Sequence, residues 1–194
     1  VDGREHALQM GGLAAALTDA EVVAAVERLD GGMLVTGTQW SGAARQHRMI
    51  GWHRVEDRAG LARLAAAIEG AGRAWRSFST GIGEALAHAR AVSAGAPLRC
   101  ARRVIDVSGD GVSNEGRPPG PVSRALAAEG YVINGLVIRG AEPDPVLHYE
   151  AEVIAGPGAF VEVADDFADY ADAMRRKLLR EIEGPLVVSE GGGK

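Results

Sequence analysis

The segment that decides the fold reads DVSGDGVSNEG and runs from Asp106 to Gly116. The apolar pair Val104-Ile105 precedes it, so the pattern predicts a buried strand that ends in an acidic, glycine-rich loop. In open α/β sheets, ligands bind at the carboxyl ends of strands. A carboxylate, hydroxyls and an amide at that edge are the oxygen ligands that Mg²⁺ and Ca²⁺ prefer. Taken alone, the segment is equally compatible with a solvated turn.

The composition is that of one globular domain with a sizeable core. The chain has 194 residues, of which 46% are hydrophobic and 24% charged. The net charge of −5 and the low aromatic content of 5% argue against a nucleic-acid surface. No apolar run is long enough to cross a membrane. The single cysteine, Cys100, excludes an intrachain disulfide, and its place before a strand indicates a small buried residue rather than a nucleophile.

Apolar periodicity predicts strands and helices in alternation. The expected strands are Met33 to Trp40, Gln46 to Val55, Val104 to Val107, Tyr131 to Ile138 and Ala159 to Val163, with a further edge strand at Leu186 to Val188. The expected helices are residues 2–17, a helix opened by a capping box of Thr18 and Glu21, and residues 57–71, 80–94, 122–129, 145–154 and 167–183.

This alternation predicts an α/β fold with a Rossmann-like, doubly wound, mostly parallel sheet. Helices should cover both of its faces, and residues 46–55 should run antiparallel at one edge because a short turn follows Trp40. We expect one domain over residues 1–184 and a C-terminal tail over residues 185–194. Three loops should converge at the carboxyl edge of the sheet, namely residues 39–42, residues 79–83 and residues 110–114.

With these loops the chain resembles the von Willebrand factor A (vWA) family, and the likeness extends from Val1 to about Glu183. The family carries a metal-ion-dependent adhesion site, MIDAS, on a Rossmann-like sheet. Three loops build it: Asp-x-Ser-x-Ser after the first strand, a Thr before a helix, and Asp-Gly after the fourth strand. Thr80 matches the family's Thr, and Asp110-Gly111 matches its Asp-Gly.

The resemblance implies a non-enzymatic, protein-binding module in which Thr80 and Asp110 are metal ligands. The metal would be Mg²⁺, or Mn²⁺ or Ca²⁺, and a carboxylate of a protein partner would complete its coordination. Trp40, Ser41 and Asn114 lie on the same loops and are the expected partner-binding residues. For Trp40 the favoured role is to cap the core, and contact with a partner is the alternative.

A narrower likeness is to an uncharacterised bacterial vWA-like subfamily. Residues 39–42, 102–111, 116–119 and 156–160 carry it, in that order. Such bacterial proteins look exported, so the resemblance implies a periplasmic or secreted location.

The chain departs from the family at its start. The first strand, with Asp-x-Ser-x-Ser, should come just before Val1, and the sequence does not contain it. Residues 106–110 imitate that motif, but they occupy the place of the fourth strand. Asp106 should therefore lie inside a strand, where a carboxylate needs hydrogen-bond partners or a shifted pKa.

An empty place in mid-sheet would orphan backbone donors and acceptors on two neighbouring strands. We therefore expect further residues upstream in the native protein. In a less favoured arrangement, Leu186 to Ser189 folds back into that place. With Thr80 and Asp110 as its remaining ligands, the chain by itself should hold no ordered metal.

Two other functions are compatible with the sequence. One is a hydrolase or phosphoryl-transfer enzyme that uses Asp106, Ser108 or Asp110. The absence of a Gly-x-Ser-x-Gly elbow and of a Walker phosphate loop weighs against it. The other is a structural domain with a degenerate site. The five histidines are scattered and indicate surface or internally satisfied residues.

Overall fold

The computed structural model describes residues 1–76 and 79–184. In chain order its elements are α1 (Gly3–Thr18), α2 (Ala20–Glu27), β1 (Met33–Trp40), β2 (Gln46–Val55), α3 (Arg58–Glu69), α4 (Ile82–Ala94), β3 (Arg103–Gly109), α5 (Pro119–Ala128), β4 (Tyr131–Ile138), α6 (Val146–His148), the π-helical turn η1 (Tyr149–Val153), β5 (Val161–Ala164) and α7 (Tyr170–Glu183). The predicted alternation of strands and helices, and with it a mixed α/β fold, is confirmed. The expected edge strand at Leu186 lies outside the described residues.

The described strands form two sheets. β3, β4 and β5 are parallel and lie in that order, whereas β1 and β2 form a separate antiparallel pair. The antiparallel hairpin and the parallel sheet match the prediction. No described strand joins β1 to β3, so among the described residues there is a gap in mid-sheet, as expected from the absence of the family's first strand.

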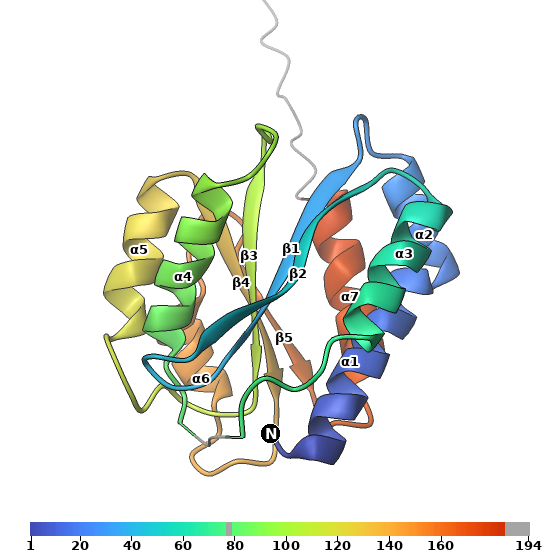
Figure 1. Ribbon diagram of the computed structural model, residues 1–194. Coiled ribbons are helices and arrows are strands. Elements are labelled where there is room, and N and C mark those ends of the chain that lie inside the picture. The colour runs from blue at the N-terminus through green and yellow to red at the C-terminus, as the bar shows by residue number, and fades with distance from the viewer. Residues whose placement is uncertain (77–78, 185–194) are drawn as a thin grey trace, which may run out of the picture.

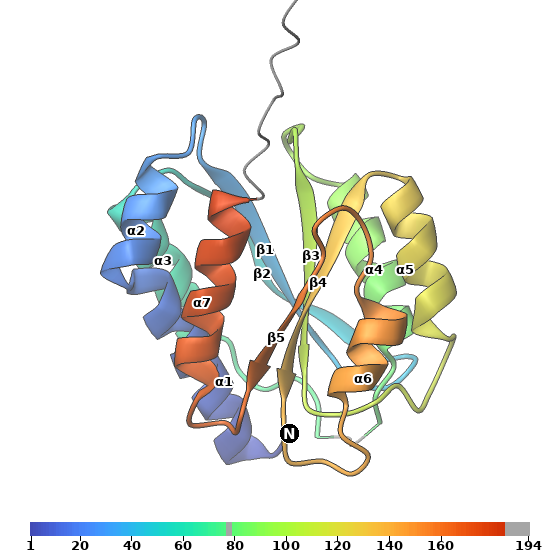
Figure 2. The same cartoon turned by 180° about the vertical axis from the view of Figure 1, so that it is seen from behind.

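Helices lie on both sides of the strands (Figure 1). One group contains α1, α2, α3 and α7, and the other contains α4, α5 and α6, as the reverse view also shows (Figure 2). The side chains of β3 alternate between the two groups, as those of a strand must. Ile105 and Val107 join the buried cluster on the α4 side, while Ser108 faces the buried Tyr170 of α7.

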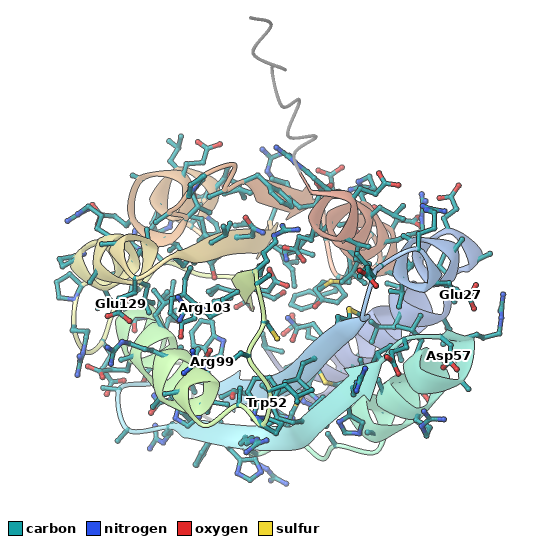
Figure 3. All side chains as sticks on the ribbon, turned by 90° about the horizontal axis from the view of Figure 1, so that it is seen from above. Glu27, Trp52, Asp57, Arg99, Arg103 and Glu129 are labelled. Carbon is teal, nitrogen blue, oxygen red and sulfur yellow. The ribbon has the colours of Figure 1, made fainter. Side chains whose placement is uncertain are left out.

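A cavity of about 2030 Å³ separates the two sheets. Every residue of β1 and of β3 lines it, together with apolar residues of α1 and α7 on one side and of α4 on the other. Seen from above, the β1–β2 pair and the three-stranded sheet lie apart (Figure 3). The facing edges of β1 and β3 have no strand partner among the described residues. We call this cavity the slot.

Two local expectations are wrong. Asp19, rather than Thr18, caps α2, because its carboxylate accepts from the backbone N–H of Glu21 at 2.9 Å. The Thr18 hydroxyl instead donates back to the carbonyl of Ala14 in α1. Cys100 is exposed rather than buried, because it lies in the turn that leads into β3 and not in the strand itself.

Candidate functional site

The first two predicted loops are joined through Ser41, directly after β1. Its hydroxyl donates to the carbonyl of Ser79 at 3.0 Å, and its carbonyl accepts from the N–H of Gly81 at 2.7 Å. Ser41 is buried. Its side chain therefore supports the loop that carries Thr80.

The second and third loops are joined through Thr80. Its N–H donates to Asn114 Oδ1 at 2.9 Å, and its carbonyl accepts from the N–H of Asn114 at 2.9 Å. The Ser113 hydroxyl adds a bond to the same carbonyl at 3.3 Å. Thr80 Oγ1 lies 3.6 Å from the position that a Cβ on Gly111 would take. The predicted convergence of the three loops is therefore present, and the threonine hydroxyl faces the Asp110-Gly111 turn.

Asp110 is hydrogen-bonded to the first residue of the described chain. Its Oδ2 accepts from the backbone nitrogen of Val1 at 3.0 Å, and its side chain is 33% exposed. Arg73 fixes the position of Val1 by donating to its carbonyl at 2.6 Å. A carboxylate and a nearby hydroxyl are oxygen donors of the kind that suits a hard divalent cation. The residues present thus fit the metal that the vWA resemblance implies.

The turn formed by α6 and η1 supports the Asp110 loop from below. The N–H of Ser113 donates to Nε2 of His148 at 3.2 Å. Burial lowers the pKa of His148, so the ring is neutral at pH 7 and Nε2 can accept. The adjacent Tyr149 is wholly buried. The sequence offers no spacing signal for this support, because His148 lies 35 residues after Ser113.

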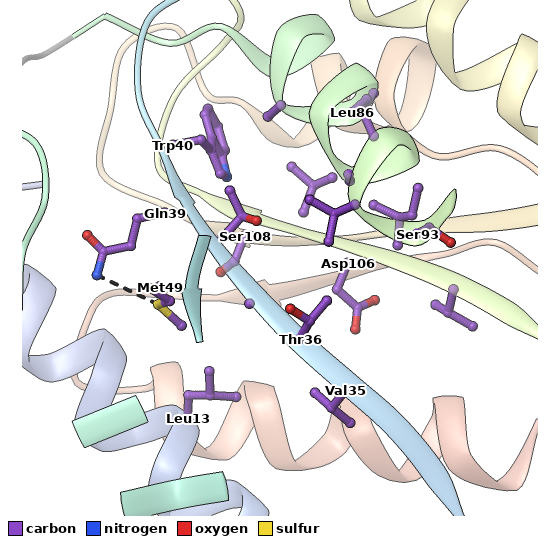
Figure 4. Close-up of a pocket in the computed structure, with 18 of the residues that line it drawn as sticks. Leu13, Val35, Thr36, Gln39, Trp40, Met49, Leu86, Ser93, Asp106 and Ser108 are labelled. Carbon is purple, nitrogen blue, oxygen red and sulfur yellow. Dashed lines mark hydrogen bonds between the residues drawn. The ribbon is translucent and has the colours of Figure 1, made fainter. Parts of the chain in front are cut away.

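Trp40 ends β1 beside the Asp110 loop. Its ring is half-buried and packs against the core cluster of Ile105, Val107 and Tyr149. Figure 4 shows it at one end of the slot, near Ser108. Trp40 therefore caps the core, as one of its two expected roles requires. Asn114, by contrast, is exposed.

Asp106 forms a charge cluster with the buried residues Lys177 and Glu181 of α7. The Lys177 ammonium contacts both carboxyl groups, and Asn134 donates to Glu181 Oε1 at 2.7 Å. The side chain of Asp106 is 41% exposed and lines the slot (Figure 4). The expectation that Asp106 lies in a strand and requires a partner is confirmed.

The protonation of this cluster follows from burial and charge. Burial raises the pKa of Asp106, but the Lys177 ammonium and a hydrogen bond with Glu181 outweigh it, so the net pKa lies below the usual value. Burial, followed by the charge of Asp106, raises the pKa of Glu181 to about 9. At neutral pH the cluster is therefore an Asp106–Lys177 ion pair beside a protonated Glu181. Neither the sequence position nor the amphipathic pattern of α7 signals that Lys177 is buried.

These contacts bear on the alternative enzymatic function. The Ser108 hydroxyl donates to the hydroxyl of Tyr170 at 3.2 Å, a group that is not a general base at neutral pH. Asp106 is held by Lys177. Among the described residues, no three His, Cys, Asp or Glu side chains gather as a metal cluster.

Comparison with known proteins assigns a family. Residues 1–186 match the family described as "Protein of unknown function (DUF1194)", and the chain belongs to it. No curated protein matches the chain significantly.

Solved structures with a similar fold come from the mussel byssus. Proximal thread matrix protein 1 (PTMP1), crystal form 2, is 18% identical with a TM-score of 0.69, over 94% of this chain and 44% of that chain. A second PTMP1 structure is 17% identical with a TM-score of 0.67, over 91% of this chain and 42% of that one. A third, titled as having a zinc-occupied MIDAS motif, is 17% identical with a TM-score of 0.63, over 94% and 44%.

This likeness supports a vWA-like fold. The chain spans less than half the length of these solved chains. Their titles name matrix proteins and no enzyme. Within residues 1–76 and 79–184, no helix is both long and apolar enough to cross a bilayer.

Proposed function

We propose that this chain forms most of a non-enzymatic, metal-ion-dependent protein-binding module. Thr80 and Asp110 would hold a divalent cation, Mg²⁺ or else Mn²⁺ or Ca²⁺, at the carboxyl edge of the strands. The observation that carries the proposal is the paired hydrogen bonding of Thr80 with Asn114, which fixes the threonine loop against the Asp110-Gly111 turn.

The residues have distinct tasks in this proposal. Asp110 supplies charge, and the Thr80 hydroxyl supplies a neutral oxygen. The bound cation would supply an open coordination position for the carboxylate of a protein partner. Asn114 is exposed beside that position and can contact the partner. Ser41 and Trp40 support the site without facing the partner. The Ser41 hydroxyl donates to the Ser79 carbonyl, and Trp40 packs on the core.

We further propose that an additional strand occupies the slot. It would pair with β1 on one side and β3 on the other, and so unite the two sheets into one doubly wound, Rossmann-like sheet. All residues of both strands line the slot, and helices flank it on both sides. A strand there would be apolar on both faces. Its carboxyl end would reach the edge where Thr80 and Asp110 lie, as the Asp-x-Ser-x-Ser strand of the vWA family would.

The location and the alternative function are also matters of proposal. We propose export to the periplasm or outside the cell, in line with the bacterial vWA resemblance. An enzyme that uses Asp106 or Ser108 is less well supported, because Lys177 neutralises the first and Tyr170 pairs with the second.

The slot proposal is tested with two proteins, residues 1–194 and the same chain extended by its encoded upstream residues. Hydrogen–deuterium exchange would compare the amides of β1 and β3, with β4 as an internal control because it already has partners on both sides. The extended protein should protect β1 and β3 far more strongly and leave β4 little changed. Equal exchange of β1 and β3 in the two proteins would contradict an upstream strand in the slot.

A further inference from the structure

Tyr149 carries a hydroxyl that the fold buries without satisfying. Its side chain is fully buried, and no group of the described residues hydrogen-bonds its Oη. An unpaired buried hydroxyl costs about 1–3 kcal/mol, and folded proteins keep few of them. Replacement by phenylalanine would remove this cost with almost no change in shape. We therefore expect a hydrogen-bond acceptor that this hydroxyl could reach.

The position of this hydroxyl points to the candidate cation site. A Cβ on Gly109 would lie 2.6 Å from Tyr149 Oη and 3.6 Å from Cη2 and Cζ2 of Trp40. The phenol thus fills the space left by the missing side chain at the last residue of β3. Asp110 is the next residue along the chain.

The segment that carries Tyr149 is already tied to the same loop. His148 accepts from the N–H of Ser113, three residues beyond Asp110. Tyr149 also begins the π-helical turn η1, and such turns are frequent at functional sites. The adjacent residues His148 and Tyr149 therefore both lie against the Asp110 loop. His148 has a hydrogen-bond partner there, whereas the Tyr149 hydroxyl has no acceptor among the described residues.

We propose that Tyr149 is a positioning residue of the cation site, whose hydroxyl donates a hydrogen bond to the Asp110 carboxylate when that carboxylate binds a divalent cation. This inference rests on the proposed function. The backbone nitrogen of Val1 engages Oδ2, which leaves Oδ1 for the phenol. Carboxylates that bind metals are commonly held by such outer hydrogen bonds.

Tyr149 keeps its proton, as a donor must. Burial raises the pKa of its hydroxyl, and the negative charge of Asp110 raises it further. Gly109 is equally part of the arrangement, because any side chain there would occupy the path between the phenol and the loop.

The test uses the protein with its encoded upstream residues and Mn²⁺ as the probe, titrated calorimetrically. Tyr149→Phe should weaken Mn²⁺ binding by about 10- to 100-fold. Its Tm without metal should not fall, because no hydrogen bond within the described chain is lost. The matched control is Tyr131→Phe, whose hydroxyl bonds Ser93 at 3.0 Å at the opposite end of the sheet. That variant should lose stability and keep its Mn²⁺ affinity.

The outcomes separate this inference from the proposed function. If wild type binds Mn²⁺, Asp110→Ala does not, and Tyr149→Phe binds as wild type does, the positioning role of Tyr149 is wrong and the cation site stands. If Tyr149→Phe lowers the Tm without metal and keeps its affinity, the phenol hydrogen-bonds another group of the fold and not the Asp110 carboxylate, and the inference is likewise overturned. If wild type binds no Mn²⁺, both proposals fail.

Discussion

Thr80 and Asn114 are joined by two reciprocal hydrogen bonds. The N–H of Thr80 donates to Asn114 Oδ1, and the N–H of Asn114 donates to the Thr80 carbonyl, each at 2.9 Å. The two residues come from different loops, one before α4 and one after β3. This pair determines how the Thr80 hydroxyl faces the Asp110-Gly111 turn.

Asn114→Ala should therefore loosen the Thr80 loop. One side-chain acceptor is lost at an exposed position, so the free energy of unfolding should fall by about 0.5–1.5 kcal/mol. Cation affinity should fall several-fold as the two ligands lose their mutual orientation. Asn114→Asp is the matched control, because its carboxylate oxygen can still accept from Thr80. Urea denaturation and Mn²⁺ titration of both variants check this, and equal affinities in Asn114→Ala and wild type would contradict it.

Glu181→Gln should change the pH dependence of stability. The folded state raises the pKa of Glu181 from 4.5 to about 9, so between these values the folded protein binds the extra proton. Stability from this group is then lost as pH rises, by up to about 1 kcal/mol per pH unit. Glutamine mimics the protonated acid and removes this slope. Urea denaturation from pH 5 to pH 8 should show a flatter profile for the variant, and parallel profiles would be the contrary result.

Lys177→Met should be destabilising, by about 1–3 kcal/mol, because it leaves the Asp106 carboxylate, which is 41% exposed to the slot, without its partner. The double variant Lys177→Met with Asp106→Leu removes the stranded charge and should recover much of the loss. Equilibrium denaturation of both variants measures this. If the double variant is as unstable as the sum of the two single variants, the two residues do not act as a pair.

Gly109→Ala should cost about 1–3 kcal/mol, because its Cβ would lie 2.6 Å from the Tyr149 hydroxyl. In a Tyr149→Phe background the same change should cost clearly less, since the clashing oxygen is gone. A double-mutant cycle of unfolding free energies measures the coupling. Additive effects would show that the phenol does not limit the space at Gly109.

The sequence predicted most of the helices and strands, and it predicted that the three loops meet at one edge of the strands. β-branched runs such as Tyr131–Ile138 marked the strands, and parallel strands bring their carboxyl ends to one edge. Thr80 and Asp110 were singled out through the resemblance to the vWA family, whose Thr and Asp-Gly they match on two of these loops.

Contacts between distant segments could not be predicted. Lys177 lies on a helix rich in charged residues, and its burial follows only from the docking of α7 against Asp106. Tyr149 and His148 are ordinary residues of a short turn, and their link to the Asp110 loop spans 35 residues or more. The cap of α2 was misplaced by one residue because Thr18 and Asp19 are both good caps, and the Thr18 hydroxyl bonds α1 instead.

The most direct measurement is calorimetric titration of Mg²⁺ into the protein with its encoded upstream residues, as wild type and as Asp110→Ala. Wild type should bind one Mg²⁺ per chain, and Asp110→Ala should bind none. The Tm without metal should be nearly the same in both, because a loop carboxylate that is one-third exposed contributes little to the core. Equal Mg²⁺ affinity in the two proteins would show that Asp110 is not a ligand and that its loop is a plain turn.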